Sequence, residues 1–157
     1  MSSVKKNENN DYINTFLVKI FGQILRKEEK ALFEYCKKNN TPPISVKEFH
    51  LLEAVNLKKK HNKNTAGSIA NYLGITIGSL STAVKTLKKK ELIKGVKNTD
   101  DKRKLYLFLT KNGEEANEYH QNFHKKMINE IKEELTEEET ELMAHTLFKL
   151  HKYFGKF

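Results

Sequence analysis

The sequence predicts a mainly α-helical protein with one small β-hairpin, and two patterns support this prediction. Apolar residues recur every three or four positions in long segments at both ends of the chain, as in amphipathic helices. Between Leu92 and Leu109 the pattern changes to two short β-prone runs, LIKGV and LYLFL, which flank the charged segment NTDDKRK. Two such runs around a polar turn are typical of a hairpin.

The composition indicates one folded domain over residues 1–157, in which 38% of the residues are hydrophobic and 31% are charged. No apolar run approaches the roughly 18 residues of a membrane-spanning helix, so we expect no membrane insertion. The start, MSSVKKNENNDY, does not resemble a signal peptide. A single cysteine, Cys36, excludes an intramolecular disulfide framework. We therefore expect a cytoplasmic protein.

The excess positive charge is concentrated in the middle of the chain. The formal net charge is +9, and residues 56–104 contain 13 Lys and Arg against 3 Asp and Glu. The remaining residues contain 16 basic and 17 acidic side chains. A localised basic block between nearly neutral flanks is typical of a nucleic-acid-binding module. A basic surface that docks on an acidic protein or a membrane is the alternative from another functional class.

The first expected element is a long helix over residues 11–38, which we assign to dimerisation, after about ten disordered residues. Its end is set by the polar segment NNTPP, because proline disfavours helix in the residue before it. The helix carries an apolar stripe that a partner must cover: Ile13, Phe16, Leu17, Ile20, Phe21, Ile24 and Leu25.

Several later helix starts are indicated by capping residues. Ser45 with Glu48, and Thr136 with Glu139, have the spacing of capping boxes. Further N-caps are expected at Thr65, Thr76 and Thr110.

Residues 66–85, AGSIANYLGITIGSLSTAVK, have the organisation of a helix-turn-helix. Gly74 stands in the turn, where a positive φ is usually needed. Short polar side chains near the start of the second helix suit base edges and phosphates in a major groove, and we predict DNA contacts from Ser79, Ser81, Thr82 and Lys85. The following lysines, Lys88, Lys89 and Lys90, suit phosphates.

The hairpin over residues 92–110 follows this motif directly, and its tip carries Asp101, Lys102 and Arg103. Helix, turn, helix and a basic hairpin form a winged helix-turn-helix, which we expect over residues 45–110. The wing would reach the adjacent groove through Lys102 and Arg103. The alternative is an ordinary helical hairpin with a solvated lysine face.

The helices expected within residues 111–155 carry two further apolar stripes. Long amphipathic helices are rarely stable alone, so we expect these to pack with the first helix and with a second copy in a homodimer. The stripes are Ala116, Tyr119, Phe123, Met127, Ile131 and Leu135, then Leu142, Met143, Leu147, Leu150 and Phe154.

Three segments resemble the MarR family of bacterial transcription regulators in order and spacing. They are ISVKEFHLLEAV, TAGSIANYLGITIGSLSTAVKTLKKKELI and TDDKRKLYLFLTKNGEEA, with the D-x-R of the wing at Asp101 and Arg103 and the LT-x-x-G of its exit at Leu109, Thr110 and Gly113. The resemblance implies a MarR-like homodimer whose terminal helices interlock and whose winged lobes bind a palindrome in double-stranded DNA. It also implies that Arg103 contacts the minor groove or backbone and that Asp101 orients it.

Within the family, SVKEFH, GITIGSLSTAV and YHQNFHKKM are similar to the FabT-like group of fatty-acid biosynthesis repressors. That resemblance implies repression of fatty-acid and membrane-lipid synthesis genes. It also implies an acyl ligand, presented on acyl carrier protein, that strengthens DNA binding. No cofactor is required for this function.

Three histidines favour an alternative, a zinc-responsive or other metal-sensing repressor. His120 and His124 lie four apart on one expected helix, and His50 lies on a helix that packs close to it in this fold. Zinc would need a fourth ligand, and Cys36, Glu29 and Glu34 are nearby candidates. The positions resemble those of zinc-responsive members of the family. The structural alternative is that the histidines only form hydrogen bonds.

Cys36 stands near the end of the first helix, where the helix dipole would raise the pKa of its thiol, so we interpret it as structural. An enzyme is not expected. The sequence has no phosphate-binding glycine loop, no G-x-S-x-G and no helical H-E-x-x-H.

Overall fold

The computed structural model describes residues 3–98, 101 and 104–155. The chain folds into two compact units, residues 1–120 and 121–157. The first unit contains most of the elements, and helix α6 (Lys111–Glu133) runs across the boundary. None of the helices in the described ranges is long and apolar enough to cross a membrane.

The first unit begins with three helical segments in succession: α1 (Ser3–Thr15), a π-helical stretch (Phe16–Ile20) and α2 (Phe21–Lys38). The expectation that the first ten or so residues are disordered is wrong for the segment from Ser3 onward. No glycine or proline interrupts this segment before Gly22, and extending an existing helix costs far less than nucleating one.

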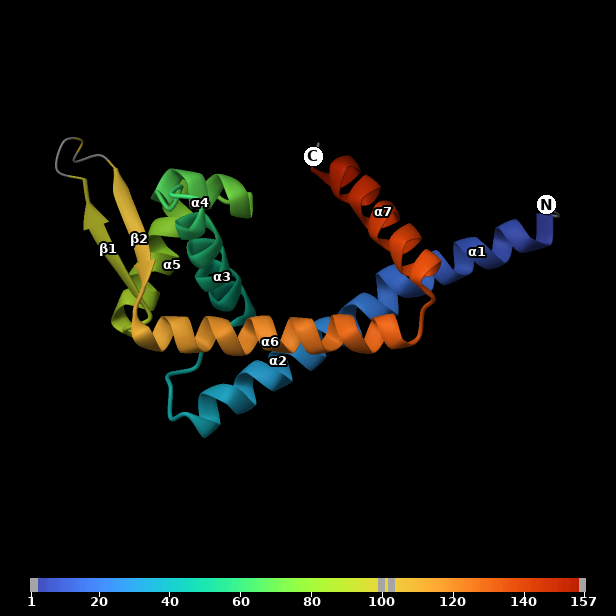
Figure 1. The fold of residues 1–157 in the computed structure, drawn as a ribbon, viewed down its shortest axis with the longest axis horizontal. Helices are drawn as coiled ribbons and strands as arrows, with labels where there is room; N and C mark the ends of the chain where they lie inside the picture. The colour runs from blue at the N-terminus through green and yellow to red at the C-terminus, as the bar shows by residue number, and fades with distance from the viewer. Residues whose placement is uncertain (1–2, 99–100, 102–103, 156–157) are drawn as a thin grey trace. The chain divides into compact units, whose positions relative to one another are not determined.

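The winged lobe consists of three helices and a hairpin: α3 (Val46–Lys60), α4 (Ala66–Leu73), α5 (Ile77–Lys89), β1 (Ile93–Lys97) and β2 (Leu105–Leu109). Figure 1 shows the antiparallel strands beside α5 and α3. Ile93 pairs with Leu109 at the base of the hairpin and Lys97 pairs with Leu105 toward its tip. The predicted fold class, mainly α with a small β-hairpin, is confirmed.

The core of this unit is continuous from α2 through the lobe to the start of α6. Its largest fully buried side chains include Leu32 of α2, Phe49 of α3, Ile69 of α4 and Leu80 of α5. Leu107 of β2 and His120 of α6 are also fully buried. The hairpin and the helix-turn-helix therefore share one core, and the hairpin cannot be displaced without uncovering apolar surface.

The predicted helix caps are confirmed. Ser45 and Thr136 each form a complete capping box with the glutamate three residues later. Thr65 and Thr76 cap α4 and α5 through their side-chain oxygens. Thr110 accepts from the Gly113 amide at 3.1 Å and donates to the Glu91 carbonyl at 2.6 Å.

The second unit contains the C-terminal part of α6 and helix α7 (Glu137–Phe154). No residue of α7 is buried. Large apolar side chains of α7 are about half exposed or more: Leu142, Leu147, Phe148, Leu150, Tyr153 and Phe154. Apolar side chains in the first unit are similarly exposed along α1 and the π-helical stretch: Ile13, Phe16, Leu17 and Ile20.

Candidate nucleic-acid interface

The turn between α4 and α5 is built as the sequence predicts. Gly74 ends α4 in the left-handed conformation, with φ of 65°, and donates its amide hydrogen to the carbonyls of Ala70 and Asn71. Thr76 then caps α5, because its side chain accepts from the Ser79 amide at 3.1 Å. The two caps fix where one helix ends and the next begins, and so fix the direction of α5.

Helix α5 buries one face and exposes the face that we predicted to contact DNA. Leu80, Val84 and Leu87 are at most 5% exposed and attach the helix to the core. The predicted contact residues on this helix are exposed: Ser79, Ser81, Thr82, Lys85 and Lys88.

The hydroxyl groups on this face are not equivalent. Ser79 accepts a hydrogen bond from the Thr76 hydroxyl at 2.9 Å, so it belongs to the cap. Thr82 donates to the Gly78 carbonyl at 3.2 Å, which leaves its methyl group and oxygen lone pairs outward. Within the described part of the chain, the Ser81 side chain makes no hydrogen bond. Ser81 is therefore the hydroxyl best placed to pair with an external group.

The hairpin is anchored by Asn64, a residue that sequence reasoning missed. The Asn64 side chain is buried and donates to the Leu107 carbonyl at 2.8 Å, while the Leu107 amide donates to the Asn64 carbonyl at 3.0 Å. Thr65 forms an isolated bridge with Tyr106. These bonds tie β2 to the start of α4. A polar residue in a loop gives no pattern that would predict this role.

The tip of the wing is partly described. The Asn98 amide donates to the Lys104 carbonyl at 3.0 Å, and the Asp101 amide donates to the Asn98 side chain at 2.8 Å. Asp101 also forms an ion pair with Lys104 at 3.7 Å. Lys102 and Arg103 lie outside the described residues, so their contacts with DNA and the support of Arg103 by Asp101 stay predictions.

The three consecutive lysines after α5 have different environments. Lys88 is exposed and its ammonium lies beside Gly95 of β1, and Lys89 is exposed. Lys90 is not available for phosphate, which corrects the sequence-based interpretation. Its ammonium contacts Glu48 Oε1 at 2.7 Å and donates to the Pro43 carbonyl at 2.6 Å. The residue follows the last turn of α5, where the chain directs the side chain toward α3.

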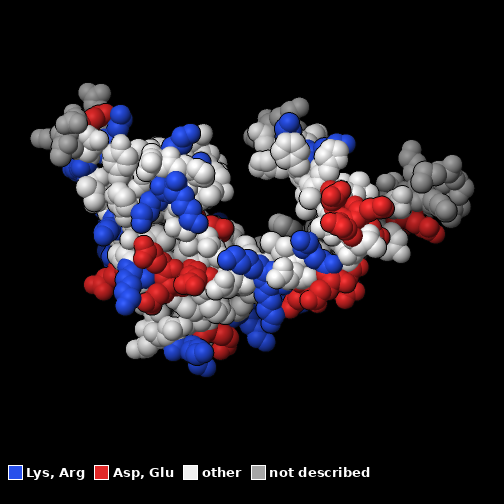
Figure 2. Space-filling model, in the orientation of Figure 1, with Lys and Arg blue, Asp and Glu red and all other residues white. Residues whose placement is uncertain are grey.

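Positive charge lies over the winged lobe, as the sequence indicates. Figure 2 shows Lys and Arg over the hairpin and the neighbouring helices, and acidic side chains of this unit gathered lower, near the start of α6. Lys58 lies over the ring of Tyr72 at 4.4 Å from its centroid, at the edge of the helix-turn-helix. The surface that carries the exposed face of α5 is therefore suited to an anionic partner.

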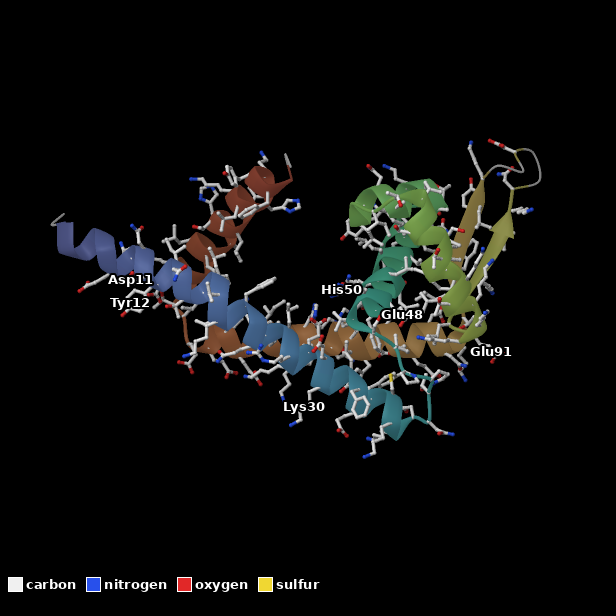
Figure 3. The ribbon with its side chains drawn as sticks, turned by 180° about the vertical axis from the view of Figure 1, so that it is seen from behind. Asp11, Tyr12, Lys30, Glu48, His50 and Glu91 are labelled. Atoms are coloured by element: carbon white, nitrogen blue, oxygen red, sulfur yellow. The ribbon has the colours of Figure 1, made fainter. Side chains whose placement is uncertain are left out.

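Two of the three predicted histidines, His50 of α3 and His120 of α6, meet around Glu28 of α2. His120 Nε2 lies 2.8 Å and His50 Nε2 lies 3.3 Å from Glu28 Oε1, and the two imidazole rings are 5.3 Å apart. Figure 3 labels His50 on α3. His124 follows one turn after His120 on α6, within the second unit. The acidic residue that lies with both of these histidines is Glu28, whereas the fourth-ligand candidates suggested by the sequence, Glu29, Glu34 and Cys36, are not part of this cluster.

His120 is held between two carboxylates. Its Nδ1 lies 3.4 Å from Glu53 Oε2, opposite the bond to Glu28. Burial lowers the pKa of His120, but the hydrogen bonds and charges of Glu53 and Glu28 outweigh this effect and raise the pKa above its ordinary value. The pair of carboxylates therefore favours the protonated, cationic form of His120.

Cys36 is buried in the core, 4% exposed. Burial raises the pKa of its thiol, although a hydrogen bond from the Ile44 backbone partly opposes this. The structure thus supports a packing role for Cys36, with burial as the main cause of the raised pKa.

Comparisons with known proteins agree with this geometry. The model of the MarR family matches residues 44–105. FabT from Streptococcus pneumoniae, solved in complex with DNA, is 28% identical, with 94% of this chain and 98% of that chain covered and a TM-score of 0.77. MepR from S. aureus, also solved with DNA, is 22% identical over 85% and 95% of the two chains, with a TM-score of 0.69. No curated protein sequence matches the chain.

The fold and the exposed face of α5 define a winged helix-turn-helix protein of the class that regulates transcription by binding DNA. The chain resembles the MarR family over residues 44–105 and shares the fold of FabT over most of its length. Its similarity to the S. pneumoniae protein also supports the resemblance to the FabT-like group.

Proposed function

We propose that the protein is a homodimeric repressor that occupies a palindromic operator. The observation that carries this proposal is the exposed face of α5, which presents Ser81, Thr82 and Lys85 beside a lysine-bearing wing. A recognition helix with short polar residues near its N-terminus fits a major groove, and an adjacent wing fits the neighbouring groove or backbone. Repression by occupying the operator requires no catalysed reaction.

The exposed apolar side chains support the homodimer. Phe16 and Leu17 in the first unit, and Phe148 and Phe154 in the second, are between 43% and 61% exposed. Apolar surface of this extent along helices typically marks an interface with another chain. A second copy of the chain would bury it and would supply the second lobe that a palindrome requires.

We further propose that the operator controls fatty-acid and membrane-lipid synthesis genes and that an acyl ligand on acyl carrier protein tightens operator binding. The resemblance to the FabT-like group supports this role. An open, mainly apolar cavity of about 500 Å³ between α2 and the segment before α3 is of a size that accepts a small apolar ligand. It is lined in part by Leu32, Phe33, Ile44 and Val46. Release of the operator on adding the acylated carrier protein would contradict the proposal that the ligand tightens operator binding.

Substitutions on α5 and the wing should separate sequence preference from general affinity. We expect Ser81→Ala or Thr82→Ala to change sequence preference by several-fold with little effect on nonspecific DNA. Lys85→Ala and Arg103→Ala should each weaken operator binding and reduce the slope of log affinity against log salt by about 1. Fluorescence anisotropy at several salt concentrations, with a labelled operator and with nonspecific DNA, measures the affinity, the sequence preference and the salt slope.

Lys30→Ala is the matched control, because Lys30 is an exposed lysine on α2 (Figure 3) and not on the lobe. Its affinity and salt slope should equal those of the parent protein. Unchanged operator binding in all four lobe variants would contradict the assigned contact residues.

Zinc sensing is a second candidate function, and the arrangement around Glu28 favours it. The ligand atoms of Glu28, His50 and His120 lie within 4.8 Å of one another, and two imidazoles with a carboxylate are a common zinc ligand set. His124 follows His120 at the i, i+4 spacing. A bound zinc would compete with a proton for His120 and would act as a structural or sensing ion.

A zinc titration tests this candidate. We expect zinc to bind saturably with proton release, measured by isothermal calorimetry in two buffers of different ionisation enthalpy, and to raise the melting temperature. His50→Gln should reduce zinc affinity at least tenfold without loss of stability, since the His50 side chain is 43% exposed. His145→Gln, an exposed histidine on α7, should bind zinc as the parent does. Absence of saturable binding in the parent protein would remove zinc sensing from consideration.

A further inference from the structure

An apolar side chain stands at the start of the recognition helix where the core pattern predicts burial. Ile77 is the first residue of α5, and it continues the spacing of Leu80, Val84 and Leu87. Those three are at most 5% exposed, whereas Ile77 is 56% exposed. Ile77 therefore has apolar surface that the described part of the chain leaves uncovered.

The composition of α5 limits how it can recognise bases. Its sequence, IGSLSTAVKTLKK, contains no Arg, Asn, Gln, Asp or Glu. In the major groove, Arg or Lys pairs with guanine, Asn or Gln makes bidentate bonds to adenine, and Asp or Glu accepts from cytosine, so of these side chains α5 offers only lysine. What remains is hydroxyl groups, lysines and methyl groups. The base feature that an aliphatic side chain can recognise is the C5-methyl group of thymine.

We propose that Ile77 is a specificity-determining residue that contacts the C5-methyl group of a thymine in each half of the operator. The inference rests on the proposed operator binding. Ile77, Ser81 and Lys85 follow one another at four-residue spacing, so the apolar contact is continuous with the predicted polar and phosphate contacts. Exposed lysines at positions 85, 88 and 89 complement the phosphates around such a thymine.

The residue after Ile77 favours a close approach of the helix end to DNA. A Cβ atom at Gly78 would meet only the Thr76 hydroxyl, at 3.8 Å, so the space beside the first turn is open. An aliphatic side chain next to an open backbone can reach the floor of a groove with little steric conflict. A protein partner at the same apolar surface would not depend on thymine, and the experiment below separates these outcomes.

The test uses the full-length protein and a duplex that it selects from a randomised library. Each thymine of a half-site is replaced by deoxyuridine, which removes only the C5-methyl group, and affinities are measured by fluorescence anisotropy. At one thymine per half-site we expect roughly a fourfold loss of affinity per methyl contact, the value of one buried methyl group. Ile77→Ala should lose a similar factor on the thymine duplex and nothing further on the deoxyuridine duplex at that position.

Ile75→Ala is the control, since Ile75 lies in the turn before α5 and is 39% exposed. The loss of affinity caused by Ile75→Ala should be the same on the thymine duplex and on the deoxyuridine duplex, so that the two losses multiply. Multiplicative losses for Ile77→Ala at every thymine, or unchanged binding by Ile77→Ala, would overturn the inference and leave operator binding intact. If the parent protein selects no duplex, the proposed function itself fails, and this inference fails with it.

Discussion

Gly113→Ala is expected to destabilise the protein by about 3 kcal/mol, at the upper end of overpacking effects. Gly113 is buried in the first turn of α6, directly behind the hairpin. A Cβ atom at this position would overlap the carbonyl oxygen of Leu92 and lie 3.4 Å from the Leu109 Cβ. The backbone at Leu92 cannot move freely, because its carbonyl accepts from the Thr110 amide at 3.1 Å.

The clash must therefore displace either the base of the hairpin or the start of α6. Thermal or urea unfolding of the variant would measure the loss of stability, and operator binding should fall with it because the wing is attached at this point. Gly67→Ala is the matched control, since a Cβ atom at Gly67 meets nothing within 4 Å. Alanine should leave that helix unchanged or stabilise it by up to about 1 kcal/mol. Equal stabilities of the two variants would contradict the packing account.

Lys90→Met is expected to lower the free energy of unfolding by about 3 kcal/mol, because it leaves the mostly buried carboxylate of Glu48 without its cation. The Glu48 and Lys90 side chains are 13% and 20% exposed. Glu48 also accepts from the Ser45 amide at 2.7 Å in the capping box, so it cannot turn away without loss of the cap. The double variant with Glu48→Gln should be less destabilised than Lys90→Met alone, because glutamine keeps the cap and carries no charge.

The same pair predicts a pH dependence of stability. Burial would raise the pKa of Glu48, but the hydrogen bonds from Lys90 and Ser45 outweigh burial and lower the pKa below its ordinary value of 4.5. A group with a lowered folded-state pKa contributes stability above its unfolded pKa and loses it as the pH falls through the folded value. The difference in the free energy of unfolding between the parent and Lys90→Met should thus be largest near neutral pH and become smaller in acid.

Chemical denaturation at several pH values measures this difference, with Lys89→Met as the control for removal of an exposed lysine at the neighbouring position. The control should lie close to the parent at every pH. A difference between the parent and Lys90→Met that stays constant down to acid unfolding would contradict the role of the ion pair.

The parts of the fold that depend on local chemistry could be predicted from the sequence. The threonines at positions 65, 76 and 110 cap helices because a hydroxyl before a helix satisfies amides that have no partner within it. Gly74 occupies a left-handed turn that only glycine adopts cheaply. The alternation around Leu107 predicts the hairpin, because successive residues of a strand point to opposite faces.

The parts that depend on distant contacts could not be predicted. Lys90 is indistinguishable in sequence from its neighbours Lys88 and Lys89, and only the position of α3 shows that it belongs to Glu48. Asn64 anchors the wing through residue Leu107, far along the chain. Glu28 approaches the histidines because α2 passes beneath α3, whereas sequence proximity suggested other acidic residues. Each of these residues is polar, and polar residues do not produce the periodic patterns that identify a core.

The measurement that most directly tests the central claim is the sequencing of genomic fragments recovered on the purified protein, with and without a chelator. We expect enriched palindromes, located upstream of fatty-acid synthesis genes and recovered in both conditions. Sites near metal transporters that are lost on chelation would favour zinc sensing instead. Recovery of fragments with no common sequence would contradict specific operator binding and would assign the basic lobe to another partner.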